Sequence, residues 1–315
     1  MRSLSFPLCA LAISLTACST PQTSLGAAQP PSSSTIPRQA NASQPNVLYV
    51  ADYGSGAINL LRNSDYHFVN KITSGISAPL GLTLDRNGNL YVANATGTVS
   101  EYAPRSFAPS FVYSSAMVEP FDVAVDAQEN IYEVDTNNVG GVGHNDGSVN
   151  EYAQNSNVVA QTCATNTHPI GIAMNRAADV FVAANDDVNH GHVLEYAGGL
   201  RGCNATPLGI RVGFTGGIAI DDNANLIVTD YDAGQVDVFA PPYTKVTRRL
   251  GSRERLSEPY NVSINAANTT VYVTDFDKDV VFVIDYATGK VLTKLDYSHG
   301  RISVPAGTVD APAGV

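Results

Sequence analysis

Four histidines and three aspartates lie in or near two polar segments, NNVGGVGHNDGS at residues 137–148 and NDDVNHGH at 185–192. Neutral imidazole and carboxylate are good ligands for zinc and similar ions. One hypothesis is therefore a divalent-metal or ligand site. The alternative is a pair of solvent-exposed loops, where polar side chains are ordinary. The candidate ligand residues are His144, Asp146, His168, Asp186, Asp187, His190 and His192, of which His144, His190 and His192 are the candidate metal ligands.

More specific catalytic signatures are missing from the sequence. It contains no Gly-x-Ser-x-Gly elbow and no His-Glu-x-x-His pair. The glycine-rich run at 140–147 lacks the spacing of a phosphate-binding loop. Long connections without structure of their own are usually functional or disordered. The two segments therefore favour recognition of a partner over catalysis, and no cofactor is expected unless a divalent metal binds.

Both segments belong to a repeat that runs through most of the chain. Six stretches share one pattern, as in LYVANATGTVSEYA and LIVTDYDAGQVDVFA. Their anchors recur about every 41 to 49 residues, a period typical of propellers and other repeat arrays. The anchor residues are Tyr49, Tyr91, Tyr132, Phe181, Ile227 and Tyr272.

A second strand precedes every anchor except the first. In it large apolar residues alternate with small ones, as Ile172 and Met174 flank Ala173. Radial sheets converge near an axis, so large faces must fit against small ones, and we predict a β-propeller with four antiparallel strands per blade. The C-terminal segment, which contains Pro305-Ala-Gly and Pro312-Ala-Gly, would supply the strand that the first blade lacks. Either Pro-Ala-Gly could set its register.

The repeats resemble the NHL family of six-bladed β-propellers, and the last one, VYVTDFDKDVVFVIDYATGKVLTKL, resembles the YVTN repeat. The resemblance implies an all-β domain over residues 46–315 that is closed by its C-terminal segment. In such a fold, hairpins between the second and third strands share a face with the connections between blades, so His168 should join the two polar segments. Related propellers include interaction platforms, lactonases and lyases.

Two sets of polar residues in the repeat are expected to support the scaffold. A short polar residue after each second strand should accept hydrogen bonds from the amides of its own turn. Glutamates recur in the third strands of blades two to four, at Glu101, Glu151 and Glu195. The short polar residues are Asp52, Asn94, Asp135, Asn185, Asp230 and Asp275.

The N-terminus resembles an export signal. Arg2 precedes an apolar run at 6–17 that is too short to span a bilayer. Leu-Thr-Ala-Cys18 resembles the bacterial lipoprotein processing box, so we expect lipidation of Cys18 and a periplasmic or cell-surface location. Residues 19–45 are rich in Ser, Thr, Pro, Gln and Ala, which is typical of a disordered tether.

The net charge limits the classes of partner, and the cysteine pair indicates the compartment. The formal net charge of −11 disfavours nucleic acid and anionic lipid surfaces. Cys163 and Cys203 could form a disulfide between neighbouring blades in an oxidising compartment. We therefore expect a monomeric envelope propeller that binds a protein or a glycan and contacts the membrane only through its anchor. The alternative is a metal-dependent lactonase or lyase that uses His144, His168, His190 and His192.

Overall fold

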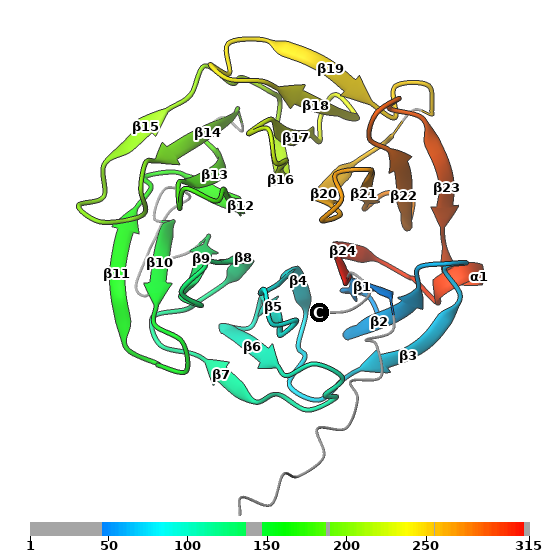
Figure 1. Ribbon diagram of the computed structural model, residues 1–315, viewed down its shortest axis with the longest axis horizontal. Coiled ribbons are helices and arrows are strands. Elements are labelled where there is room, and N and C mark those ends of the chain that lie inside the picture. Colours follow the sequence, from blue (N-terminus) through cyan, green and yellow to red (C-terminus); the bar gives the residue numbers. More distant parts are fainter. Residues whose placement is uncertain (1–45, 137–146, 187–189, 255, 312–315) are drawn as a thin grey trace, which may run out of the picture. The chain divides into compact units, whose positions relative to one another are not determined.

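The computed structural model describes residues 46–136, 147–186, 190–254 and 256–311. The chain divides into two units, residues 1–41 and 42–315, and the described residues all belong to the second. This unit is a ring of six four-stranded antiparallel sheets around a central axis (Figure 1). The prediction of an all-β, six-bladed propeller is confirmed.

Each blade runs from an innermost strand to an outermost one. Blade one contains β24 (Pro305–Ala311), β1 (Val47–Asp52), β2 (Ala57–Arg62) and β3 (Phe68–Ile72). Blade two contains β4 (Pro79–Leu84), β5 (Leu90–Asn94), β6 (Thr98–Tyr102) and β7 (Phe111–Tyr113). Blade three contains β8 (Pro120–Val125), β9 (Ile131–Asp135), β10 (Ser148–Tyr152) and β11 (Val159–Ala164).

The second half of the ring repeats this order. Blade four contains β12 (His168–Met174), β13 (Val180–Asn185), β14 (Gly191–Tyr196) and β15 (Ala205–Pro207). Blade five contains β16 (Thr215–Ile220), β17 (Leu226–Asp230), β18 (Gln235–Phe239) and β19 (Val246–Leu250). Blade six contains β20 (Pro259–Ile264), β21 (Thr270–Asp275), β22 (Val280–Asp285) and β23 (Val291–Leu295), followed by the short helix α1 (Tyr297–Gly300).

The hydrophobic core lies between neighbouring blades. Ala124 of β8 belongs to the same buried cluster as Ile172 of β12, and Ala173 shares a cluster with Ile218 of the next blade. Small residues of one innermost strand therefore meet large residues of the following one, as the alternation predicted. This fit lets six radial sheets pack closely against one another as they converge toward the axis. No helix among the described residues is long and apolar enough to cross a membrane.

The C-terminal strand closes the ring. β24 pairs antiparallel with β1, with Pro305 opposite Asp52 and Val309 opposite Tyr49. Pro305 therefore sets the register, which decides between the two Pro-Ala-Gly stretches. Because β24 pairs with β1, the first blade has the same four strands as the other five, and β1 is not left as an edge strand.

Candidate functional site

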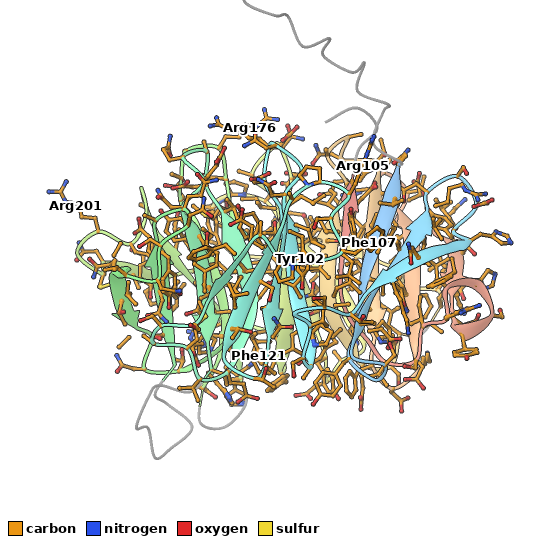
Figure 2. All side chains as sticks on the ribbon, turned by 90° about the horizontal axis from the view of Figure 1, so that it is seen from below. Tyr102, Arg105, Phe107, Phe121, Arg176 and Arg201 are labelled. Carbon is orange, nitrogen blue, oxygen red and sulfur yellow. A yellow bond between two sulfur atoms is a disulfide. The ribbon has the colours of Figure 1, made fainter. Side chains whose placement is uncertain are left out.

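The two faces of the ring carry different connections. One face bears the turns between the second and third strands and also the connections between blades; we call it the hairpin face. Phe121, next to the start of β8, lies on this face, whereas Arg105 and Arg176 lie on the opposite one (Figure 2). His144, Asp146 and Asp187 fall outside the described residues, so their predicted role stays a prediction.

A groove on blade four brings together three of the predicted residues. Asp186, His190 and His192 line a cavity of about 610 Å³ together with Arg211. The Asp186 carboxylate accepts the His190 backbone N–H at 2.8 Å and lies 3.5 Å from His190 Nδ1. Burial lowers the pKa of His192, and the Arg211 charge lowers it further. A neutral His192 is therefore favoured near pH 7.

His168 is separate from this groove. It opens β12 opposite Asn185, is half-buried and does not line the cavity. Within residues 46–136, 147–186, 190–254 and 256–311, no three His, Cys, Asp or Glu side chains are grouped closely enough to hold a metal ion. The described part of the groove thus offers two imidazoles and one carboxylate that is already paired with His190.

The repeated short polar residues cap backbone amides. Asp135 accepts the N–H groups of Val118 and Glu119 at 2.5 and 3.0 Å, just before β8. Asp275 accepts the N–H of Lys278, in its own turn, at 3.1 Å, as the sequence predicted. It also accepts the N–H of Ser257 at 2.7 Å, a partner between blades that the sequence did not predict. Asp135 and Asp275 therefore hold the segment that enters the innermost strand of their own blade, and Asp275 also holds its hairpin.

The acidic residues of the third strands serve the scaffold in part. Glu101 is buried and accepts the Tyr113 hydroxyl at 3.0 Å, and burial raises its pKa. A deeper acid, which the sequence did not predict, is Glu133 of β9: it is fully buried and accepts a hydrogen bond from Asn150 Nδ2 at 2.6 Å. Burial, and then the charge of Asp135, raises the pKa of Glu133 well above its usual range. We assign it to the packing between strands, since it lines none of the cavities described here.

Six aromatic residues around the axis form the most distinctive part of the hairpin face. Phe214 and Tyr231 have ring centres 5.7 Å apart, and those of Tyr260 and Phe276 are 5.3 Å apart. All six rings stay partly exposed, Tyr53 with 43% of its surface. We call this set the aromatic surface; it comprises Tyr53, Phe121, Phe214, Tyr231, Tyr260 and Phe276.

A repeat alignment contains the signal for this surface. Tyr53, Tyr231 and Phe276 each directly follow the repeated aspartate, and Phe121 and Tyr260 each follow the proline that opens an innermost strand. These positions all lie at the hairpin-face end of their strands. These aromatic residues have no metal-ligand or catalytic spacing, so the sequence patterns did not predict them as a site.

The axis beneath the aromatic surface holds a small cavity of about 200 Å³, lined by all six innermost strands. Asp122 and Asn261 line it from opposite blades, at a position that is glycine in the other four. The Asp122 carboxylate accepts the N–H groups of Val123 at 2.9 Å and Ile172 at 3.1 Å. Burial raises the pKa of Asp122 to about 7, and the two amide bonds oppose that rise.

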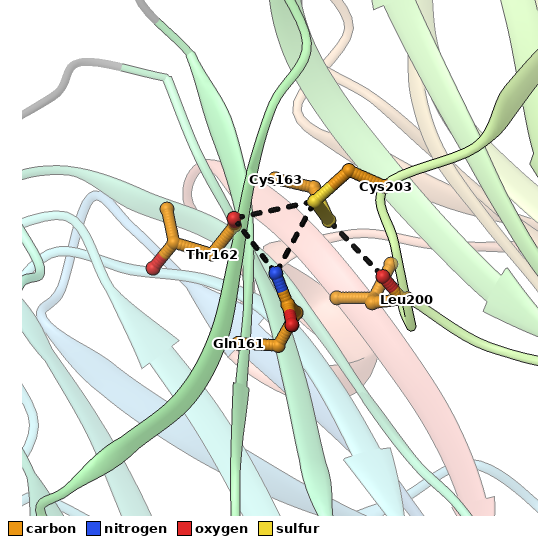
Figure 3. The surroundings of a disulfide bond; sticks show 5 residues. All are labelled: Gln161, Thr162, Cys163, Leu200 and Cys203. Carbon is orange, nitrogen blue, oxygen red and sulfur yellow. Dashed lines mark hydrogen bonds between the residues drawn. A yellow bond between two sulfur atoms is a disulfide. The ribbon is translucent and has the colours of Figure 1, made fainter.

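A disulfide joins Cys163 of β11 to Cys203, which precedes β15, with Cα atoms 5.2 Å apart (Figure 3). Gln161 Nε2 donates to the Cys203 sulfur at 3.3 Å. The Cys163 sulfur lies 3.3 Å from the Leu200 carbonyl oxygen, a packing contact because an oxidised sulfur has no proton to donate. The bond links the outer edges of blades three and four.

Comparison with known proteins supports the fold. No protein-family model and no curated protein sequence matches the chain. A chain in the crystal structure of a nidogen/laminin complex is similar over 86% of this chain and 99% of its own, with a TM-score of 0.67 and 16% identity. A protein of unknown function from Bacteroides caccae has a TM-score of 0.64 and 15% identity, covering 84% and 98% of the two chains.

A functionally unknown protein from Desulfotomaculum acetoxidans is also similar, with a TM-score of 0.60 and 14% identity over 84% of this chain and 99% of its own. At these identities the likeness shows the fold alone. Propellers support many different activities, so function has to be argued from the surface of this chain.

Proposed function

We propose that this propeller is a non-catalytic binding protein whose partner, a protein or a glycan, docks on the hairpin face. The observation that carries the proposal is the aromatic surface, six partly exposed rings around the axis. Tyrosine and other large aromatic side chains are enriched at binding hot spots because they bury much area with few rotatable bonds. The groove at His190 and His192 lies on the same face and would extend the docking area.

The likeness to a chain of the nidogen/laminin complex supports this reading, since that chain was crystallised in a complex. We also propose that the repeats belong to the NHL type and that the protein is exported and lipid-anchored through Cys18. The apolar run before Cys18 and the polar segment after it support the last proposal. A tether of this composition would let the hairpin face turn freely toward its partner.

Photo-crosslinking in the native cell envelope tests the proposal. In separate variants, a benzophenone amino acid is placed at Tyr53 or His190 on the hairpin face and, as controls, at Phe107 on the side of the ring or at Arg176 on the opposite face (Figure 2). Phe107 is a matched control because its ring is 44% exposed, against 43% for Tyr53. We expect one discrete adduct from the hairpin-face positions only. Equal adducts from both faces, or none from either, would contradict the proposal.

A further inference from the structure

Acidic side chains lie beside the aromatic surface, and they indicate what kind of partner binds there. Asp232 and Asp277 are exposed and directly follow Tyr231 and Phe276, and Glu258 directly precedes β20. Tyr231 makes a hydrogen bond to Glu258, and burial followed by this bond and the nearby acids raises the pKa of Tyr231. The rings of blades five and six are therefore surrounded by carboxylates.

These carboxylates are not neutralised within the described part of the chain. Asp232, Glu258 and Asp277 take part in none of its ion pairs. The Lys278 ammonium, which is next in sequence, lies 5.9 Å from the ring centre of Phe282 on β22, toward the outside of the blade. Asp232 and Asp277 are thus exposed and Glu258 is partly exposed beside these rings, and within the described part of the chain none of the three makes an ion pair.

The opposite face is arranged differently. There, Asp222 pairs with Arg176 at 3.0 Å and Glu129 pairs with Arg86 at 3.7 Å. Acidic composition alone therefore does not explain the uncompensated charges beside Tyr231 and Phe276. Their position beside exposed rings is the feature to be explained.

We infer that the aromatic surface binds cationic side chains, so that the docking segment of the partner is a peptide rich in arginine or lysine. This inference rests on the proposed function and narrows it. An arginine guanidinium stacks on aromatic faces and donates paired hydrogen bonds to carboxylates, and aromatic rings and carboxylates are the two groups that alternate here. Charge complementarity of this kind also steers association and makes it sensitive to salt.

Calorimetric titration with two synthetic peptides tests the inference. One alternates arginine with glycine, and the other replaces each arginine with citrulline, which keeps the shape and removes the charge. We expect the arginine peptide to bind at least about tenfold more tightly than its citrulline analogue, with an affinity that falls as salt rises. Equal binding of the two peptides, or no binding of either, would overturn the inference.

Matched variants locate the binding. The pair Asp232→Asn/Glu258→Gln should weaken the arginine peptide by about tenfold, whereas Asp222→Asn on the opposite face should change it by less than about twofold. Tyr53→Leu should weaken binding and Tyr53→Phe should not, because only the second keeps an aromatic face. Unchanged melting temperatures exclude misfolding of the variants.

Two further results would reject the cationic partner. If Asp222→Asn weakened the peptide as much as the aromatic-surface variants, its binding would reflect net charge only. If a neutral oligosaccharide bound the hairpin face and ignored the Asp232→Asn/Glu258→Gln change, the partner would be a glycan. In that second case the proposed function would stand and the inference would fail. Loss of face-specific crosslinking would instead remove the proposed function itself.

Discussion

The rings of Phe121 and Tyr260 meet across the propeller axis, with centres 6.5 Å apart and planes inclined by 46°. They come from blades three and six, which stand opposite each other in the ring (Figure 1). Asp122 and Asn261, the next residues in the same strands, line the axial cavity. Through their contact, the two rings join the aromatic residues of blade six to blade three.

Asp122 should make stability depend on pH. Its pKa of about 7 in the folded protein is raised above the unfolded value, so this residue favours folding most at low pH. The benefit is lost as pH rises from about 4 through 7, and its full size is as much as about 4 kcal/mol. We expect Asp122→Asn to flatten the dependence of unfolding free energy on pH in this window. Identical pH slopes for the two proteins in urea titrations would contradict the assignment.

Gly81 should be intolerant of any side chain. A Cβ there would lie 2.0 Å from Asp122 Oδ1 and 2.7 Å from its Cα, so backbone as well as side chain would have to move. We expect Gly81→Ala to lower the unfolding free energy by about 2 to 4 kcal/mol. Gly198→Ala is the control: it has no atom within 4 Å of the new Cβ but has a positive φ of 71°. Gly198→Ala should lower the unfolding free energy by only about 1 kcal/mol.

The repeat made the architecture predictable, because a propeller needs the same strand pattern in every blade. The alternation around Ala173 and the missing first strand were sufficient to place the blades and the closing segment. The burial of Glu133 in the stretch IYEVD could not be predicted, because nothing in that stretch shows that Asn150 of the next strand donates a hydrogen bond to Glu133. The meeting of Phe121 with Tyr260 was equally hidden, since it depends on how the ring closes and not on local spacing.

The disulfide should add substantial stability. Cys163 and Cys203 are 40 residues apart, and closing a loop of that length restricts the unfolded chain. We expect Cys163→Ala/Cys203→Ala to lower the unfolding free energy by about 2 to 4 kcal/mol. Reducing agent should lower the melting temperature of the wild type and leave that of the double variant unchanged. A wild type that is insensitive to the reductant would show that the bond contributes little.

Asp52 should control ring closure. Its carboxylate accepts the backbone N–H of Val304 at 2.9 Å and the hydroxyl of Ser303 at 2.8 Å, just before β24. Removing it leaves two partly buried donors without their acceptor, which costs up to about 1 to 3 kcal/mol for each donor. We expect Asp52→Ala to increase amide hydrogen exchange in β24 and β1 first, with Asp52→Asn intermediate. Uniform exchange across all six blades would argue against a role in closure.

Variants in the groove of blade four should separate the binding hypothesis from the hypothesis of a metal-dependent enzyme. The described groove offers His190, His192 and the Asp186 carboxylate, which already pairs with His190 Nδ1, and these side chains are not grouped closely enough in the described residues to hold a metal ion. We expect His190→Ala/His192→Ala to leave the metal content of the purified protein unchanged while weakening face-specific crosslinking. His299→Ala is the control, because His299 makes a similar pair with Asp296, at 3.0 Å, away from the groove. Equimolar zinc that disappears only in the groove variant would support a metal-dependent lactonase or lyase instead.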